Sequence, residues 1–146
     1  MTLQGRYAPS PTEWVRTQVE KYEATGGADG NEVMGRPIVV ITSRGARSGL
    51  LRKNPVMRVE HEGVYAAVAS KGGADDNPSW YANFLADPVV DLQDGPTTGT
   101  YRAREISGDE RAVWWERSAA AFPQYAKYAE GTDRLIPVFL LERIEA

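Results

Sequence analysis

The sequence predicts a mostly β fold with flanking helices (α+β), a largely antiparallel barrel in one domain spanning residues 1–146. Short apolar runs recur along the chain, and tight turns typical of hairpins separate them. The helical patterns between these runs are brief, which favours antiparallel pairing over a parallel βαβ sheet. A chain of 146 residues is also long enough to bury a core without disulfides or metals.

Composition excludes several classes of function. The formal net charge of −3 argues against general nucleic-acid binding, which requires a basic face. Cysteine is absent and His61 is the single histidine, so thiol chemistry is excluded and a histidine-built metal site is disfavoured. No apolar run approaches the roughly twenty residues of a membrane span, and no signal peptide is visible, so we expect a cytoplasmic protein.

The first 30 residues or so are expected to form an irregular arm and a helix. From Glu13 to about Thr25 the apolar residues recur at helical spacing, and they include Trp14 and Val19. We favour a helix packed on the barrel or on a partner chain. The alternative is contact with a membrane surface, which this short and weakly basic helix supports less well. A glycine-rich loop is expected at residues 24–36.

The expected strands follow from alternating or continuous apolar runs bounded by turn residues. A turn at 61–63 joins two of them, and Asp94-Gly95-Pro96 joins two others. The strands are expected at about residues 37–44, 52–60, 63–70, 89–93, 98–106 and 135–143.

Three short helices are expected between the strands. Asn77 is a favoured N-cap residue and Pro78 suits the first helical position, so a helix is expected to begin there and to end before Asp87. Ser107 and Glu110 have the spacing of a capping box, and the helix that follows is expected to bury Val113 and Trp114. Pro123 is expected to end that helix and to permit another.

A cationic glycine loop follows the first long strand. Its cations are Arg44, Arg47, Arg52 and Lys53, placed around Gly45, Ser48 and Gly49. Glycines allow backbone N–H groups to turn toward a ligand, and guanidinium groups suit phosphate or carboxylate oxygens. The loop is neither a P-loop nor a G-x-G-x-x-G motif. From spacing alone, a cofactor-anion site and a solvated basic hairpin both remain open.

Two further groups of residues could carry chemistry. Ser70 ends a strand before a glycine pair, and the next helix start offers free N–H groups to a ligand. An ordinary strand-to-helix turn would have the same pattern. Tyr125 and Tyr128 are three residues apart, hence on one helical face, where they could stack on a substrate and donate protons. Without further information, packing of these aromatic residues against the barrel is the preferred explanation.

Five motifs resemble the deazaflavin (coenzyme F420)-dependent nitroreductase family of mycobacteria and other actinobacteria. They occur in the family's order within residues 33–143. The motifs are I-T-S-R-G-A-R-S-G-L-L-R-K-N-P-V (41–56), A-V-A-S-K-G-G-A-D-D-N-P-S-W-Y-A-N (67–83), A-D-P-V-V (86–90), F-P-Q-Y-A-K-Y (122–128) and T-D-R-L-I-P-V-F (132–139). The resemblance implies a split β-barrel of the flavin-reductase-like type that binds coenzyme F420.

The resemblance also implies site residues. Residues for the phosphate and glutamyl tail are Arg47, Ser48, Gly49 and Arg52; residues lining the deazaflavin ring are Asn54, Pro55, Val56 and Met57. Residues completing the cofactor groove are Ala69, Ser70, Lys71, Gly72, Gly73, Asn77, Pro78, Trp80 and Asn83. Ser70, Tyr125 and Tyr128 match the residues that face the substrate. Met57 stands where some members carry an aromatic residue, and Phe122 stands where a tyrosine can occur.

The implied reaction is hydride transfer from reduced F420 to a small-molecule acceptor, namely a quinone, an activated alkene or a nitroaromatic compound. Tyr125, Tyr128 and Ser70 would stabilise charge on the acceptor by hydrogen bonding. An oxidoreductase that uses flavin mononucleotide (FMN) is an alternative, as are a non-catalytic F420-binding protein and a scaffold protein. The sequence is compatible with a monomer or a homodimer.

Overall fold

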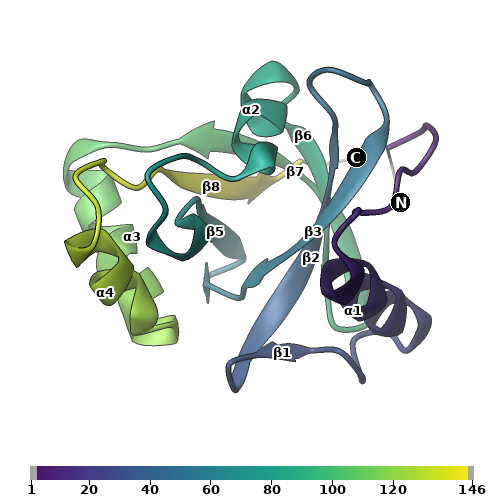
Figure 1. The fold of residues 1–146 in the computed structure, drawn as a ribbon, viewed down its shortest axis with the longest axis horizontal. Helices are drawn as coiled ribbons and strands as arrows, with labels where there is room; N and C mark the ends of the chain where they lie inside the picture. The colour runs from purple at the N-terminus through teal and green to yellow at the C-terminus, as the bar shows by residue number, and fades with distance from the viewer. Residues whose placement is uncertain (1–2, 145–146) are drawn as a thin grey trace.

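The computed structural model describes residues 3–144, in which eight strands form one sheet with antiparallel pairing between neighbouring strands (Figure 1). The sheet order is β1-β2-β6-β7-β8-β5-β4, and β3 pairs with β2. The strands are β1 (Glu32–Val33), β2 (Arg36–Arg44), β3 (Leu51–Met57), β4 (Glu60–His61), β5 (Val64–Val68), β6 (Val89–Asp94), β7 (Thr97–Glu105) and β8 (Val138–Arg143).

The sheet curls into a half-barrel because strong twist brings its two ends toward each other. β3 is one edge and β4 the other, and β3 contacts β5 without pairing to it. The predicted mostly antiparallel barrel with flanking helices is therefore confirmed. The opening between β3 and β5 is the feature that positions the site.

The helices cover the two sides of this opening (Figure 1). α1 lies against β3, while α3 contacts β5 and β8, and α4 contacts the short 3-10 turn η1. The helices are α1 (Glu13–Ala24), η1 (Lys71–Gly73), α2 (Ser79–Ala86), α3 (Gly108–Ala121) and α4 (Gln124–Glu130).

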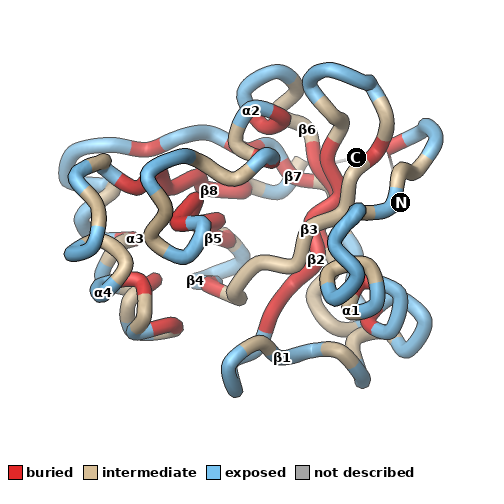
Figure 2. Tube along the Cα trace, viewed as in Figure 1, coloured by how far each residue is buried: buried red, intermediate tan, exposed pale blue. Residues whose placement is uncertain are grey.

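Alternation along the strands divides the core. In β2, Val39 and Ile41 face the main core, whereas Ile38 and Val40 lie under α1 with Tyr22. This follows from the period of two in a strand, which places successive side chains on opposite faces. Figure 2 shows β2 buried along most of its length and β3 beside it only partly buried. One face of the edge strand β3 is thus available to a ligand.

Two of the predicted helix caps differ in the structure. α2 begins at Ser79, and Pro78 is its N-cap residue with an extended ψ of 157°. Asn77 does not cap the helix, because its Oδ1 accepts a hydrogen bond from Arg134 Nη1 at 2.8 Å. Ser107 does cap α3 by position, but no side-chain cap bond forms. The predicted capping box is therefore wrong, since the Glu110 carboxylate binds the Arg104 guanidinium at 2.7 Å instead.

The structure also differs from the sequence-based predictions in the burial of one residue and in the bounds of two strands. Val113 is 47% exposed and does not join Trp114 in the core, because it lies on the outer face of α3. The last strand begins at Val138, and Leu135 precedes it with 72% of its surface exposed. The strand predicted to run from 52 to 60 ends at Met57, so β4 is a separate two-residue strand.

Candidate functional site

A cavity of about 580 Å³ lies in the opening between β3 and the β5–η1 segment. Its walls come from elements far apart in the sequence, which the curled sheet and the α4 helix bring together. We call it the head cavity. The sequence-predicted residues in its wall are Asn54, Pro55, Val56, Met57, Ser70, Lys71, Gly72, Pro78, Trp80, Tyr125 and Tyr128.

A second cavity of about 530 Å³ lies beside the loop between β2 and β3. We call it the tail cavity. Ser79, the first residue of α2, lines both cavities, so the two spaces meet at the start of that helix. The tail cavity is lined by Gly45, Ala46, Arg47, Ser48, Arg52, Ser79, Ala82 and Asn83. None of these residues is acidic.

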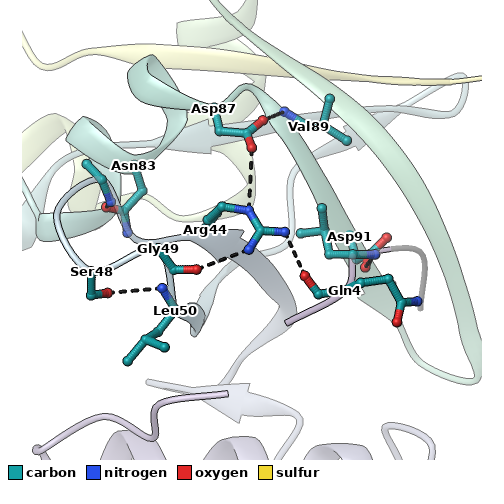
Figure 3. A network of polar contacts seen from close by, with 11 residues as sticks. Gln4, Arg44, Ser48, Gly49, Leu50, Asn83, Asp87, Val89 and Asp91 are labelled. Carbon is teal, nitrogen blue, oxygen red and sulfur yellow. Dashed lines mark hydrogen bonds and ion pairs between the residues drawn. The ribbon is translucent and has the colours of Figure 1, made fainter. Parts of the chain in front are cut away.

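The four cations of the loop do not form one site. Arg44 stabilises the loop itself, because it donates to the Gly49 carbonyl at 3.0 Å and to the Gln4 carbonyl at 2.8 Å (Figure 3). Its Nε also lies 3.7 Å from Asp87 Oδ2. Lys53 is paired with Glu23 of α1 at 2.6 Å. Arg44 and Lys53 are thus occupied by protein partners, and neither is among the residues that the resemblance implies for the cofactor.

Two of the four cations, Arg47 and Arg52, do line the tail cavity. Arg52 donates to the Ala8 carbonyl at 3.2 Å, and Arg47 forms no hydrogen bond or ion pair with the part of the chain that the structure describes. The loop is held open by Asn83, whose Oδ1 accepts from the Ala46 N–H at 2.9 Å. Two guanidinium groups around a space without carboxylates suit a phosphate or carboxylate tail.

The β5–η1 wall has an unusual backbone. Lys71, Gly72 and Gly73 have φ values of +48°, +64° and +84°, a conformation that favours glycine. The Lys71 ammonium group pairs with Asp76 at 2.8 Å, so it lies at the rim of the head cavity and not as a free cation within it. Ser70 is 7% exposed and lines the head cavity.

The two predicted tyrosines lie together in the adjoining wall, which α4 provides. Tyr125 is 4% exposed, and its ring packs edge-on against Phe122 at a centroid distance of 5.0 Å. Its ring centroid is 6.5 Å from that of Tyr128. No described residue forms a hydrogen bond with the Tyr125 hydroxyl. Burial raises the pKa of Tyr125 above its ordinary value. The phenol is therefore protonated at neutral pH, and its O–H group can donate a hydrogen bond to a ligand.

Four predicted residues lie outside the walls of both cavities. Ala69 is fully buried in the core, and the Gly49 carbonyl binds Arg44. Asn77 binds Arg134, as described above. Gly73 packs on α4, where an added Cβ would lie 3.1 Å from Tyr128 Cα. These residues shape the loops that carry the cavity residues.

Several cavity residues were not predicted. They come mainly from the N-terminal part of the chain, and they include Thr12, Trp14, Val15, Val33, Met34 and Ile38, together with Val68, Ser79 and Phe122. Trp14 and Met34 are 58% and 62% exposed. Large apolar side chains in a polar helix and a glycine-rich loop were the available signal, because isolated exposed apolar groups often mark binding surfaces.

No helix in the described part of the chain is long and apolar enough to cross a membrane. Within residues 3–144, no group of three or more acidic, histidine or cysteine side chains is placed to hold a metal ion.

Comparisons with known proteins give consistent results. The family model described as F420H(2)-dependent quinone reductase matches residues 14–143. The F420H(2)-dependent quinone reductase Rv1261c of Mycobacterium tuberculosis is 29% identical over 126 residues, which cover 84% of this chain and 85% of the relative.

Two solved structures are more similar in sequence. A structure of an F420-H2 dependent reductase (FDR-A) is 53% identical, covers 73% of this chain and 95% of its own, and has a TM-score of 0.70. A structure described as a domain-swapped dimer is 51% identical, with a TM-score of 0.72, and covers 91% of this chain and 100% of its own.

Proposed function

The chain belongs to the F420H(2)-dependent quinone reductase family, and we propose that its head cavity is where a quinone is reduced by coenzyme F420. Coenzyme F420 is the cofactor of this family. When bound, reduced F420 supplies a hydride from its C5 carbon. The observation that carries the proposal is the junction at Ser79 of a cationic cavity with a mostly apolar one. Such a pair suits a ligand with an anionic tail and a flat ring system.

We propose that Arg47, Ser48 and Arg52 hold the tail, with Asn83 keeping their loop in place. Both guanidinium groups line the tail cavity, and Arg47 has no described protein partner that a ligand would have to displace. Residues 54–57 would then lie along the ring, on the unpaired edge of β3. Pro55 has no N–H group, so this edge does not leave an unsatisfied donor against a flat apolar surface. The opposite groove wall would be Ser70, Lys71, Gly72, Pro78 and Trp80.

The acceptor would lie between the ring and the aromatic wall. Tyr125, Tyr128 and Ser70 are the polar groups of that wall, and we assign them the hydrogen bonds that stabilise negative charge on the acceptor oxygen. A buried phenol with a raised pKa is protonated at neutral pH, so Tyr125 can donate without prior proton uptake. Phe122 and the tyrosine rings exclude water from the space and orient a flat acceptor.

Activated alkenes and nitroaromatic compounds are further proposed acceptors, because the wall offers donors to any developing oxyanion and its lining is mostly apolar. A steady-state assay with reduced F420 and a panel of quinones, enones and nitro compounds tests this. Quinone reduction without alkene or nitro reduction would restrict the proposal to quinones. No reduction of any acceptor would refute the proposed function.

An FMN-dependent enzyme and a non-catalytic F420 carrier are separated by binding experiments. Trp80 lines the head cavity, so its fluorescence should be quenched when a flat cofactor binds. We expect quenching by F420 at lower concentration than by FMN, because the tail cavity is built around two guanidinium groups. Tighter binding of FMN would favour the alternative, and quenching by F420 without turnover would indicate a carrier.

We also propose that the chain forms a homodimer, on the ground that a relative with 51% identity is described as a domain-swapped dimer. Light scattering coupled to size-exclusion chromatography measures the mass directly. A mass of one chain at micromolar concentration would leave the monomer as the working form.

A further inference from the structure

Arg134 lies between α4 and β8, and it binds the segment that forms one wall of the head cavity. Its guanidinium group donates four hydrogen bonds to that segment. They run from Nε to the Ala74 carbonyl (2.8 Å), from Nη1 to Asn77 Oδ1 (2.8 Å), and from Nη2 to the Ala69 (3.1 Å) and Ser70 (2.8 Å) carbonyls.

All four acceptors are uncharged oxygens, and the described ion pairs do not include Arg134. The Arg134 guanidinium group therefore acts through the planar arrangement of its N–H donors and not through an ion pair. A guanidinium group presents five N–H donors in a rigid plane, which a lysine ammonium group cannot reproduce. The contacts of Arg134 reach both ends of residues 69–77, so this side chain closes the segment into a fixed loop.

This segment would not hold its shape unaided. Lys71 has a φ of +48°, which is unfavourable for a residue with a side chain, and Gly72 and Gly73 follow with positive φ values. Within the segment the described contacts are short-range backbone bonds, such as Gly73 N–H to the Ser70 carbonyl at 3.0 Å, and the exposed Lys71–Asp76 ion pair at 2.8 Å. Yet the same turn supplies Ser70, Lys71 and Gly72 to the cavity wall.

The segment also touches the tyrosine wall. An added Cβ at Gly73 would lie 3.1 Å from Tyr128 Cα and 3.2 Å from Tyr128 Cβ, so the two backbones are in close contact. Arg134 comes six residues after Tyr128 in the chain and binds the segment on the side of Ser70. The separation between the Ser70 hydroxyl and the tyrosine hydroxyls is thus fixed by these two contacts together.

Resting on the proposed function, we propose that Arg134 is a positioning residue for hydride transfer. It does not line either cavity, and it acts by holding Ser70 and the η1 backbone at the distance from Tyr125 and Tyr128 that an acceptor requires. Misplacing a donor by about 1 Å can lower a rate by roughly 100-fold, so we expect loss of this side chain to lower turnover.

Arg111 provides a matched control. It is also a partly buried arginine that donates to a backbone carbonyl, that of Ile136 at 2.7 Å, and its guanidinium group lies 4.9 Å from the Trp115 ring centroid. Neither of these partners, Ile136 and Trp115, belongs to residues 69–77 or lines the head cavity. Loss of either arginine removes a buried donor, and only Arg134 is bound to the cavity wall.

Hydrogen–deuterium exchange of the ligand-free protein tests the structural part. In Arg134→Gln the amides of Gly73 and Ala74 should exchange about 10-fold faster or more, since these report local opening of η1. Arg111→Gln should leave them unchanged, and Arg134→Lys should restore protection only in part. Equal protection of both amides in the wild type and Arg134→Gln would overturn the proposal.

A double-mutant cycle with Ser70→Ala tests the functional part. Arg134→Gln should lower kcat by about 10-fold to 100-fold in the wild-type background, with a much smaller factor when Ser70 is already alanine. The same factor in both backgrounds would show that Arg134 does not act through Ser70 and would overturn this role. If the wild type itself reduces no acceptor with reduced F420, the proposed function falls, while the exchange experiment still decides whether Arg134 holds the wall.

Discussion

Replacing Tyr125 by phenylalanine separates catalysis from folding. The Tyr125 side chain is 4% exposed, and its hydroxyl has no described protein partner. Because Tyr125 lines the head cavity and its hydroxyl has no described protein partner, phenylalanine removes no protein hydrogen bond and should leave stability little changed. Turnover should fall by about 100-fold, the effect of removing one donor to a developing oxyanion.

The assay is a single-turnover measurement with reduced F420 and saturating quinone, accompanied by thermal unfolding and by F420 titration. The dissociation constant of F420 should change little, because the tail cavity is unaltered. A rate equal to that of the wild type would remove the Tyr125 hydroxyl from the mechanism. A parallel loss of stability would show that the hydroxyl has a structural partner after all.

Tyr22→Phe is the matched control. Tyr22 is 1% exposed, but its hydroxyl donates to the Gln93 carbonyl at 3.2 Å and accepts from the Gly95 N–H at 2.6 Å. Removing it leaves buried groups unsatisfied, so we expect a loss of about 1–3 kcal/mol in the free energy of unfolding. Turnover at a temperature where the variant is folded should match the wild type. The two phenols thus have opposite expected outcomes.

Three further predictions follow from the site. Arg47→Ala should weaken F420 binding about 10-fold and leave the stability of the protein unchanged. Because the contact is electrostatic, the loss of affinity should be smaller at high salt. Unchanged affinity would exclude Arg47 from the tail site. Gly73→Ala should destabilise the chain by about 1–3 kcal/mol, because φ is +84° and the new Cβ meets Tyr128; an unchanged melting temperature would contradict this close contact. Burial raises the pKa of Tyr125 above 10.0. The free energy of unfolding should therefore fall as the pH rises above 10, and it should fall less in Tyr125→Phe. Identical pH profiles for the two proteins would refute the raised pKa of Tyr125.

The overall fold could be predicted because alternation and turn chemistry are local signals. The turn at 94–96 and the continuous apolar run of β8 both appear in the sequence; the structure has the turn where expected and the strand with a later start, at Val138. The caps could not be predicted as well, since Asn77 and Glu110 have favourable local roles that tertiary contacts override. In each case a guanidinium group outside the helix binds the side chain instead: Arg134, 57 residues away, binds Asn77, and Arg104, six residues away, binds Glu110.

The candidate site could be predicted only in part from the sequence, because its residues are separated by contacts between distant parts of the chain. Arg44, Arg47, Arg52 and Lys53 carry the same charge and lie close together in the sequence, so spacing alone cannot separate their roles. Their partners, Asp87 for Arg44 and Glu23 for Lys53, lie far away in the chain and become neighbours only through folding. The contribution of α1 to the head cavity was missed because helical periodicity indicates which face is buried and gives no information on what the exposed Trp14 adjoins.

The cations of the β2–β3 loop thus have two linked roles. Arg44 fixes the loop, and Arg47 and Arg52 line the tail cavity that the fixed loop forms. Arg44 fixes the β2–β3 loop to the start of the chain and to the end of α2, and Asn83 of the same helix holds the loop backbone at Ala46. Because α2 also begins at Ser79, where the two cavities meet, the same helix sets the tail site and the ring site relative to each other. A cofactor that binds through both its ends requires this fixed spacing, since any freedom between the two sites would be lost as entropy on binding. The rigid connection through α2 therefore favours one long, two-part ligand over two small independent ones.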